Sequence, residues 1–147
     1  MTANKLKLNY FFKKIDNIEV NEGAFVTSDE IFNQTSISLE AKEGAEIKLK
    51  LAVQKVKIRA VSGGIIKIQG KATNQEVSIG TGGILEAENL ETEQTTIKIT
   101  TGGEAQIRAS AYVDAQVRAG GTITIFGNPK QIDKKTVLGG TIQEAKR

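Results

Sequence analysis

The stretch VSIGTGGILEA, residues 77–87, holds the pattern that decides the fold. On each side of its Gly-Gly pair, apolar residues alternate with polar ones, which is the period of a β-strand. Glycine adopts a positive φ without steric cost, so the pair predicts a sharp corner between two short strands. The pattern recurs along the chain, with Gly-Gly pairs at Gly63-Gly64, Gly82-Gly83, Gly102-Gly103, Gly120-Gly121 and Gly139-Gly140 and single glycines at Gly23 and Gly44.

The corners are evenly spaced, and the residues between them align. The first glycines at 63, 82, 102, 120 and 139 lie 18 to 20 residues apart, and the steps from 23 to 44 and from 44 to 63 are 21 and 19. Apolar residues recur two positions after each pair and five and three positions before it. In the column three positions before the pairs, the last repeat has Val137 one place late, because that column predicts Thr136. The first two of these columns are Ile66, Leu85, Ala105, Ile123 and Ile142 after the pairs, and Ile58, Val77, Ile97 and Ala115 before them.

A coil of about 19 residues cannot bury its own apolar face, but stacked coils can. The sequence therefore predicts an all-β fold, a single-stranded right-handed parallel β-helix (β-solenoid) with about 19-residue coils, right-handed because parallel crossovers almost always are. An antiparallel sandwich or barrel is the alternative, but it needs neither a constant repeat nor matching columns. We expect one domain, 1–147, with 1–22 as an N-terminal cap or first irregular coil and 23–147 as coils.

Aromatic and charged residues add two expectations. Five of the seven aromatic residues precede the regular repeats, which suits a cap over exposed strand edges: Tyr10, Phe11, Phe12, Phe25 and Phe32. In the stack, Lys67 is expected beside Glu86 and Lys57 beside Glu76, so that opposite charges are neighbours where the local charge reverses.

Composition excludes several kinds of chemistry. The 147 residues include no cysteine and no histidine, so thiol catalysis, a Ser-His-Asp site and zinc sites built on these ligands are ruled out. No apolar run approaches the roughly 20 residues of a membrane helix. The polar, basic start at 1–9 lacks the pattern of a signal peptide. The net charge of +3 gives no argument for nucleic acid.

The remaining candidates for chemistry are few. Asp114 and Asp133 stand in equivalent places and would be neighbours, either as a carboxylate pair for sugar hydrolysis or calcium or, in the interpretation we favour, as a solvated turn ladder near Lys134 and Lys135. The basic stretch 48–71 could attract polyanions, but it lacks interleaved aromatic residues and is expected to be a solvated face. We therefore predict no catalytic residue, no metal site and no cofactor, and the binding residues are left open.

Several motifs resemble the bacterial family described as "putative auto-transporter adhesin, head GIN domain". The Ser/Thr-Gly-Gly corners at 62–64, 81–83 and 101–103 match, and residues 113–121 (VDAQVRAGG) resemble the family pattern L-D-x-x-V-S-G-G-G. Residues 121–129 (GTITIFGNP) resemble G-x-I-x-Y-x-G-N-P, residues 139–142 (GGTI) resemble the family's end, and residues 12–20 resemble its opening strand. The resemblance covers most of the chain and is best from about Ala60 onward.

The resemblance implies a non-catalytic protein of the cell envelope, periplasm or exterior, adhesin-like, binding a glycan or a protein through flat β faces. Two other functions are open at this stage. One is a self-assembling scaffold of the bactofilin kind, associating through coil ends. The other is a polysaccharide-acting enzyme, for which a groove lined with several carboxylates would be needed. No nucleic-acid partner is expected.

Overall fold

A computed structural model of the chain describes residues 5–7 and 15–145, and every regular element among them is a β-strand. All the strand pairs are parallel, and they join into one continuous sheet. The strands are β1 (Lys5–Lys7), β2 (Asn17–Val20), β3 (Phe25–Ala41), β4 (Glu46–Val61), β5 (Ile65–Gly80), β6 (Ile84–Thr101), β7 (Glu104–Ala119), β8 (Thr122–Phe126), β9 (Gln131–Thr136) and β10 (Thr141–Glu144).

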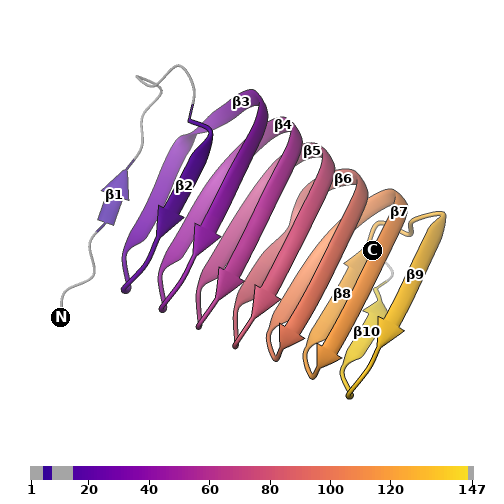
Figure 1. The fold of residues 1–147 in the computed structure, drawn as a ribbon. Helices are drawn as coiled ribbons and strands as arrows, with labels where there is room; N and C mark the ends of the chain where they lie inside the picture. The colour runs from indigo at the N-terminus through magenta and orange to yellow at the C-terminus, as the bar shows by residue number, and fades with distance from the viewer. Residues whose placement is uncertain (1–4, 8–14, 146–147) are drawn as a thin grey trace.

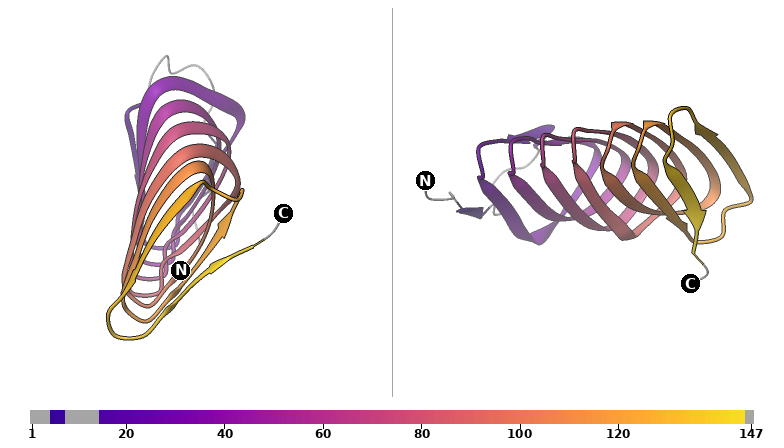
Figure 2. Two further views of the ribbon diagram at one scale, coloured as in Figure 1. Left: turned by 90° about the vertical axis from the view of Figure 1, so that its right-hand side faces the viewer. Right: turned by 90° about the horizontal axis from the view of Figure 1, so that it is seen from below.

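The strands stack as successive coils of a flattened solenoid of about seven turns, and Figure 1 shows the coils following one another from the N-terminal to the C-terminal end. Each coil descends on the near side, turns at the lower edge and rises on the far side, so the solenoid is right-handed. The end-on view in Figure 2 shows a narrow cross-section with a tight lower edge and a rounded upper one. The predicted right-handed parallel β-helix is thereby confirmed.

Each coil has two walls, a corner and a bend. The front wall holds the segments that precede the corners, with β2 and β9, and the back wall holds the segments that follow them, with β1, β8 and β10. We expected two short strands in each coil, but β3 to β7 are single strands of 16 to 18 residues that run round the bend. The reason is that pairing continues there, for example Leu51 with Gly70 and Val53 with Ala72.

The predicted columns form the core. On the back wall the register aligns Ile47, Ile66, Leu85, Ala105, Ile123 and Ile142. On the front wall it aligns Leu39, Ile58, Val77, Ile97 and Ala115. Except for Ile142, which is partly buried, these side chains are at most 6% exposed. Burying a large aliphatic side chain contributes about 1.5–3 kcal/mol, so the columns are the main source of stability.

The corners differ in one detail from the expected Gly-Gly turn. At residues 62–64 the turn is made by Ser62 and Gly63, both in the left-handed region with φ of 51° and 76°. Gly64 instead allows close approach of the preceding coil, because a Cβ on it would lie 2.0 Å from the carbonyl oxygen of Ala41. The last three corners do have positive φ at both glycines: Gly102-Gly103, Gly120-Gly121 and Gly139-Gly140.

The C-terminal coil is polar where earlier coils are apolar. Lys134 continues the column of Ala115, and Glu144 continues that of Ile125. The Nζ of Lys134 lies 3.2 Å from Oε2 of Glu144, so an ion pair joins the two walls at this end of the core. The expected slip at Val137 is wrong, because Thr136 pairs in register with Val117 and leaves Val137 54% exposed.

At the other end, β1 pairs with the beginning of β3, and β2 with its end. Two residues of β2, Ile18 and Val20, are buried in the core cluster. The cap residues Tyr10, Phe11 and Phe12 lie outside the described residues, and so do 8–14 as a whole. The single domain with a cap at 1–22 stays a prediction.

Candidate functional site

The two aspartates singled out from the sequence are neighbours in the structure. Asp114 of β7 pairs in register with Asp133 of β9 on the front wall. One carboxylate is already engaged, because the hydroxyl of Tyr112 donates a hydrogen bond to Oδ2 of Asp133 at 2.6 Å. This hydrogen bond, with smaller contributions from desolvation and the two carboxylates, raises the pKa of Tyr112 to about 12. Asp133 is therefore joined to β7 by a hydrogen bond between coils.

A metal site is not built around this pair. Among residues 5–7 and 15–145, no three acidic side chains come together in a group that could hold a metal ion. Calcium takes six to eight oxygen ligands, far more than two neighbouring carboxylates supply.

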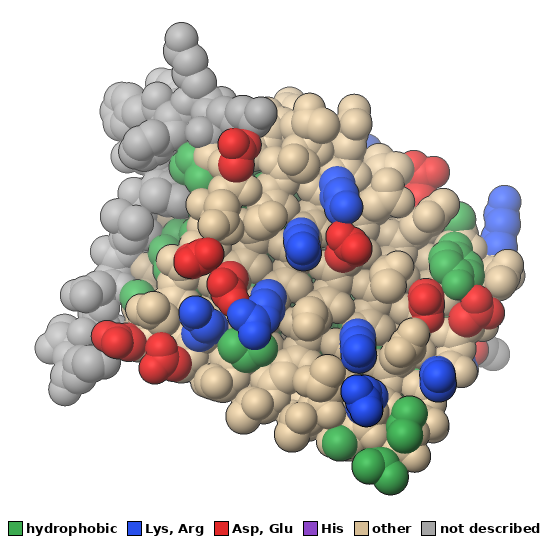
Figure 3. Space-filling model, in the orientation of Figure 1, with side chains coloured by type: hydrophobic (Ala, Val, Ile, Leu, Met, Phe, Trp, Pro, Cys, Tyr) green, Lys and Arg blue, Asp and Glu red, His purple; other side chains and the backbone are tan. Residues whose placement is uncertain are grey.

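The basic stretch 48–71 is divided between the walls. Lys48 and Lys67 lie on the back wall, and Lys55, Lys57 and Arg59 lie on the front wall. Acidic side chains on the neighbouring coils lie beside most of these basic residues. Figure 3 shows basic and acidic groups scattered over the front face. The stretch thus forms no single surface for a polyanion.

The predicted charge ladder is correct in register. Lys67 pairs with Glu86 and Lys57 with Glu76. The Nζ of Lys67 lies 4.0 Å from Glu86 and 3.6 Å from Glu46 on its other side. The ion pair of Glu76 is formed diagonally with Lys55, at 3.1 Å. Such surface pairs contribute about 0.2–1 kcal/mol each, so they mark the register more than they stabilise it.

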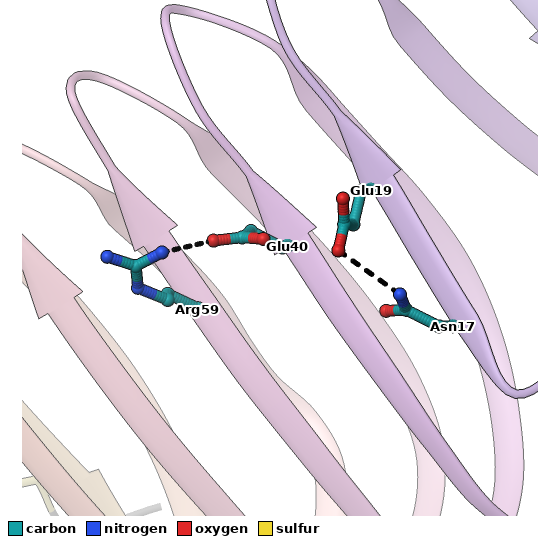
Figure 4. Close-up of polar contacts among 4 residues, drawn as sticks. All are labelled: Asn17, Glu19, Glu40 and Arg59. Atoms are coloured by element: carbon teal, nitrogen blue, oxygen red, sulfur yellow. Dashed lines mark hydrogen bonds and ion pairs between the residues drawn. The ribbon is translucent and has the colours of Figure 1, made fainter.

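Pairing between coils continues at the N-terminal end of the front wall. Figure 4 shows Arg59 of β4 directed at Glu40 of β3, with which it forms an ion pair. On β2, the side-chain amide of Asn17 donates to Oε1 of Glu19 at 3.2 Å. Polar contacts on this part of the front wall therefore run both between coils and along one strand.

The concave feature of most interest lies at the bend rather than on a wall. It is an open hollow of about 470 Å³, within the 300–1,000 Å³ typical of ligand sites. Four coils and the turn after β8 contribute to it. Its lining residues are Val53, Lys71, Ala72, Thr73, Glu91, Thr92, Glu93, Arg108, Ala109, Ser110 and Gly127.

Irregular pairing produces the hollow. Between β6 and β7 the register runs from Glu86 paired with Gln106 to Glu91 paired with Arg108, which leaves three extra residues on β6. A further shift follows between Thr92 and Gln94. Bulges of this kind are common beside functional sites because they redirect side chains. The register of β6 with β7 is therefore shifted at the bend, while the register on the two walls is kept.

The floor of the hollow is a column of small side chains that contains one polar residue, Thr92. Thr92 aligns with Val53, Ala72 and Ala109, and it is 5% exposed. Its hydroxyl lies 2.6 Å from the carbonyl oxygen of Arg108 and 2.8 Å from the hydroxyl of Thr95. Small side chains make the surface recede here, and the hydroxyl brings hydrogen-bonding capacity into an otherwise apolar column.

One side of the hollow is fixed by Arg108. Its Nε donates to the carbonyl oxygen of Glu88 at 2.7 Å, across the bulge. Its guanidinium carbon lies 5.6 Å from the centre of the Phe126 ring, a cation–π arrangement. These two contacts hold the arginine against the coil on either side.

Sequence reasoning missed the hollow, although one signal was present. The corner-to-corner steps of 20 residues from Gly82 and 18 residues from Gly102 are the uneven ones among the Gly-Gly repeats. Because the walls stay in register, the difference must be absorbed away from the corners. An uneven step between regular repeats therefore marks a coil whose bend is irregular.

The fold and surface define a class: a right-handed β-solenoid with polar walls, built from glycine-cornered coils. Within that class, the model of the family described as "Putative auto-transporter adhesin, head GIN domain" matches residues 2–129, and the chain belongs to this family. The resemblance inferred from the sequence motifs is confirmed. A search of curated protein sequences finds no match to the chain.

Two solved structures are similar in fold. A putative adhesin from Bacteroides fragilis is 22% identical with a TM-score of 0.83, over 89% of this chain and 61% of that one. A putative lipid-binding protein from Parabacteroides distasonis is 18% identical with a TM-score of 0.71, over 97% of this chain and 56% of that one. The chain thus spans less than two thirds of either neighbour. The described residues contain no helix long and apolar enough to cross a membrane.

Proposed function

We propose that the chain is a non-catalytic, adhesin-like binding module of the cell envelope that recognises a surface glycan or protein. The observation that carries the proposal is the pair of walls, on which outward polar side chains repeat in register from coil to coil. Parallel strands lie about 4.8 Å apart, so a wall offers a regular array to an extended ligand. Membership of a family described as adhesins supports the same function and an envelope location.

Binding of a lipid inside the fold has less support. The neighbour from Parabacteroides distasonis is described as lipid-binding, but at 18% identity it shares the fold alone. Here the space between the walls is filled by the chain's own apolar columns, which include Ile47, Ile66 and Leu85 at no more than 1% exposure. A lipid tail would have to displace this packing.

A self-assembling scaffold is also less well supported. Coil ends would join by pairing of their open strand edges, which would bring the inward columns of two copies together. The C-terminal coil places Lys134, Thr136 and Glu144 in register with those columns. Burying these groups against another copy would carry a desolvation cost.

The test is binding of the purified full chain to an array of envelope glycans and extracellular-matrix proteins, with circular dichroism as a check on folding. Two charge reversals are compared, Lys57→Glu with Lys98→Glu on the front wall and Lys48→Glu with Lys50→Glu on the back wall. We expect binding without release of new reducing ends, weakened at least tenfold by one pair and little by the other. Failure to bind any array member, or enzymatic release of sugar ends, would overturn the proposal.

A further inference from the structure

We infer that the hollow at the bend is a subsite for a neutral, polyhydroxylated ligand, a segment of an uncharged oligosaccharide. This inference rests on the proposed binding function and assigns the ligand class to one place on the surface. The hollow differs from the walls in being concave, and it spans four consecutive coils. A ligand there is contacted from several sides, whereas a ligand on a wall is contacted from one.

Charge balance selects an uncharged ligand. The lining includes two basic side chains, Lys71 and Arg108, and two acidic ones, Glu91 and Glu93. Register places Lys71 beside Glu91 and Glu91 beside Arg108, so the signs alternate along the solenoid axis. An anionic ligand would gain from one set and be repelled by the other, and the reverse holds for a cation. A neutral ligand pays neither cost.

The hydrogen-bonding groups select a ligand rich in hydroxyls. Carboxylates only accept hydrogen bonds, ammonium and guanidinium groups only donate, and hydroxyls do both. All three kinds line the hollow, with Thr73 and Ser110 supplying exposed hydroxyls. A hydroxyl group on the ligand can donate to a carboxylate and accept from a lysine at once, which suits neighbouring hydroxyls on a sugar ring. The small side chains of Ala72 and Ala109, on either side of Thr92, leave room for the ring itself.

A buried polar chain under the floor is the second, independent observation. Thr92 contacts Thr95, and Thr95 accepts a hydrogen bond from Nε2 of Gln75 at 3.2 Å. The three side chains are at most 5% exposed, and Oε1 of Gln75 has no partner in the structure. Polar groups in a core cost stability, and a buried unpaired acceptor costs about 1–3 kcal/mol. Because Thr92 lines the hollow, this chain of buried polar groups reaches the surface there.

The experiment titrates the isotope-labelled full chain with three neutral probes, maltohexaose, cellohexaose and chitohexaose, and with anionic oligogalacturonate for comparison. We expect at least one neutral probe to shift the amide resonances of Thr73, Glu93 and Ser110. Ser110→Trp fills the hollow from its exposed rim, and we expect it to weaken that binding at least tenfold. The matched control, Thr35→Trp, places the same side chain at an exposed position in β3, a coil that does not line the hollow, and should leave the affinity within twofold.

Glu93→Gln provides a second variant that changes the charge but hardly changes the shape of the side chain. It should weaken binding of the neutral probe and strengthen binding of oligogalacturonate. The inference is overturned if no neutral probe shifts these resonances, if Ser110→Trp binds like the parent, or if a peptide ligand from the array occupies the hollow instead. Wall variants that abolish array binding, with the hollow variants silent, would leave the proposed function standing and remove only the subsite.

Discussion

The corner and the bend are the two ends of every coil, and they follow opposite rules. At the corner, each position accepts only one kind of residue and keeps its register with the next coil. Gly64 has no room for a side chain, and the backbone N–H of Gly63 donates a hydrogen bond to the carbonyl oxygen of Thr81 in the next coil at 3.1 Å. At the bend, the pairing of β6 with β7 skips residues on both strands. The comparison teaches that this fold keeps its register at one edge, which leaves the other edge able to vary and to carry a binding site.

Single-residue insertions should separate the two regions most strongly. An alanine inserted between Ser78 and Ile79 forces either Ile79 to face solvent or Ser78 and Glu76 to face the core, because a slip of one residue reverses a strand. We expect a loss of roughly 3–6 kcal/mol in the free energy of unfolding, from lost apolar burial and buried polar groups.

The matched insertion lies in the bulge, between Glu88 and Asn89, where β6 already has residues that pair with none on β7. It should cost less than about 1 kcal/mol, because a segment that is already bulged can take one more residue at a small entropic cost. Urea unfolding followed by circular dichroism measures both variants. Equal losses at the two positions would show that the bend is as tightly specified as the front wall that leads into the corner.

Glycine substitutions should divide the corner itself. Gly64→Ala places a Cβ 2.0 Å from the oxygen of Ala41, so the backbone must move, and we expect about 3 kcal/mol of destabilisation. Gly82→Ala meets no atom within 4 Å but keeps a φ of +75°, which costs about 1–2 kcal/mol. Thermal unfolding of both variants gives the ranking. A larger loss for Gly82→Ala would mean that turn conformation, and not close approach, fixes the corner.

The contrast also explains what could be predicted from the sequence. Period-two columns such as Ile66, Leu85 and Ile123 depend on alternation and a constant repeat, and both are visible in the chain. The division of labour between Gly63 and Gly64 was not visible, because it depends on the distance to a neighbouring coil. The continuous strands round the bend are not evident from the sequence, because the polar residues there resemble breaks between two short strands.

The hollow could not be predicted for a different reason. Its residues Lys71, Glu91 and Arg108 do not share one spacing, since the steps between them are 20 and 17 residues. They meet only because bulges shift the register at the bend. A constant repeat reveals only the residues that share its spacing, so a site created by departures from that repeat is not visible in the sequence.

Gln75 allows the bend side to be stabilised. It occupies a column whose neighbours are Val56 and Thr95, and its Oε1 is buried without a partner. Gln75→Leu removes that acceptor, and Thr95 keeps its contact with Thr92. We expect a gain of about 1 kcal/mol in the free energy of unfolding. Val56→Gln, the reverse change one coil earlier, is the control and should destabilise. A loss in Gln75→Leu would show that the polar chain is needed for folding.

The smallest effect concerns Tyr112, whose hydrogen bond to Asp133 joins β7 to β9 just beyond the bend. The chain has two tyrosines, so a Tyr10→Phe background isolates the absorbance of the Tyr112 phenolate. We expect that signal to titrate with a pKa of about 12, compared with 10.0 for an unperturbed tyrosine. Asp133→Asn should lower the pKa substantially. Asp114→Asn should lower it less, because that carboxylate acts only through its charge and is the smallest contributor.

The same raised pKa fixes a direction for stability. The folded chain holds the Tyr112 proton up to a pH of about 12, whereas the unfolded chain releases it near 10.0. The stabilisation from this hydrogen bond is therefore fully present below pH 10 and is lost as the pH rises through 12. In Tyr112→Phe this part of the alkaline decline should disappear. If the phenol of the parent chain titrates near 10 instead, the hydrogen bond between Tyr112 and Asp133 does not hold β9 to β7 in solution. The last coil would then be joined to its neighbour less firmly than the coils are joined at the corners.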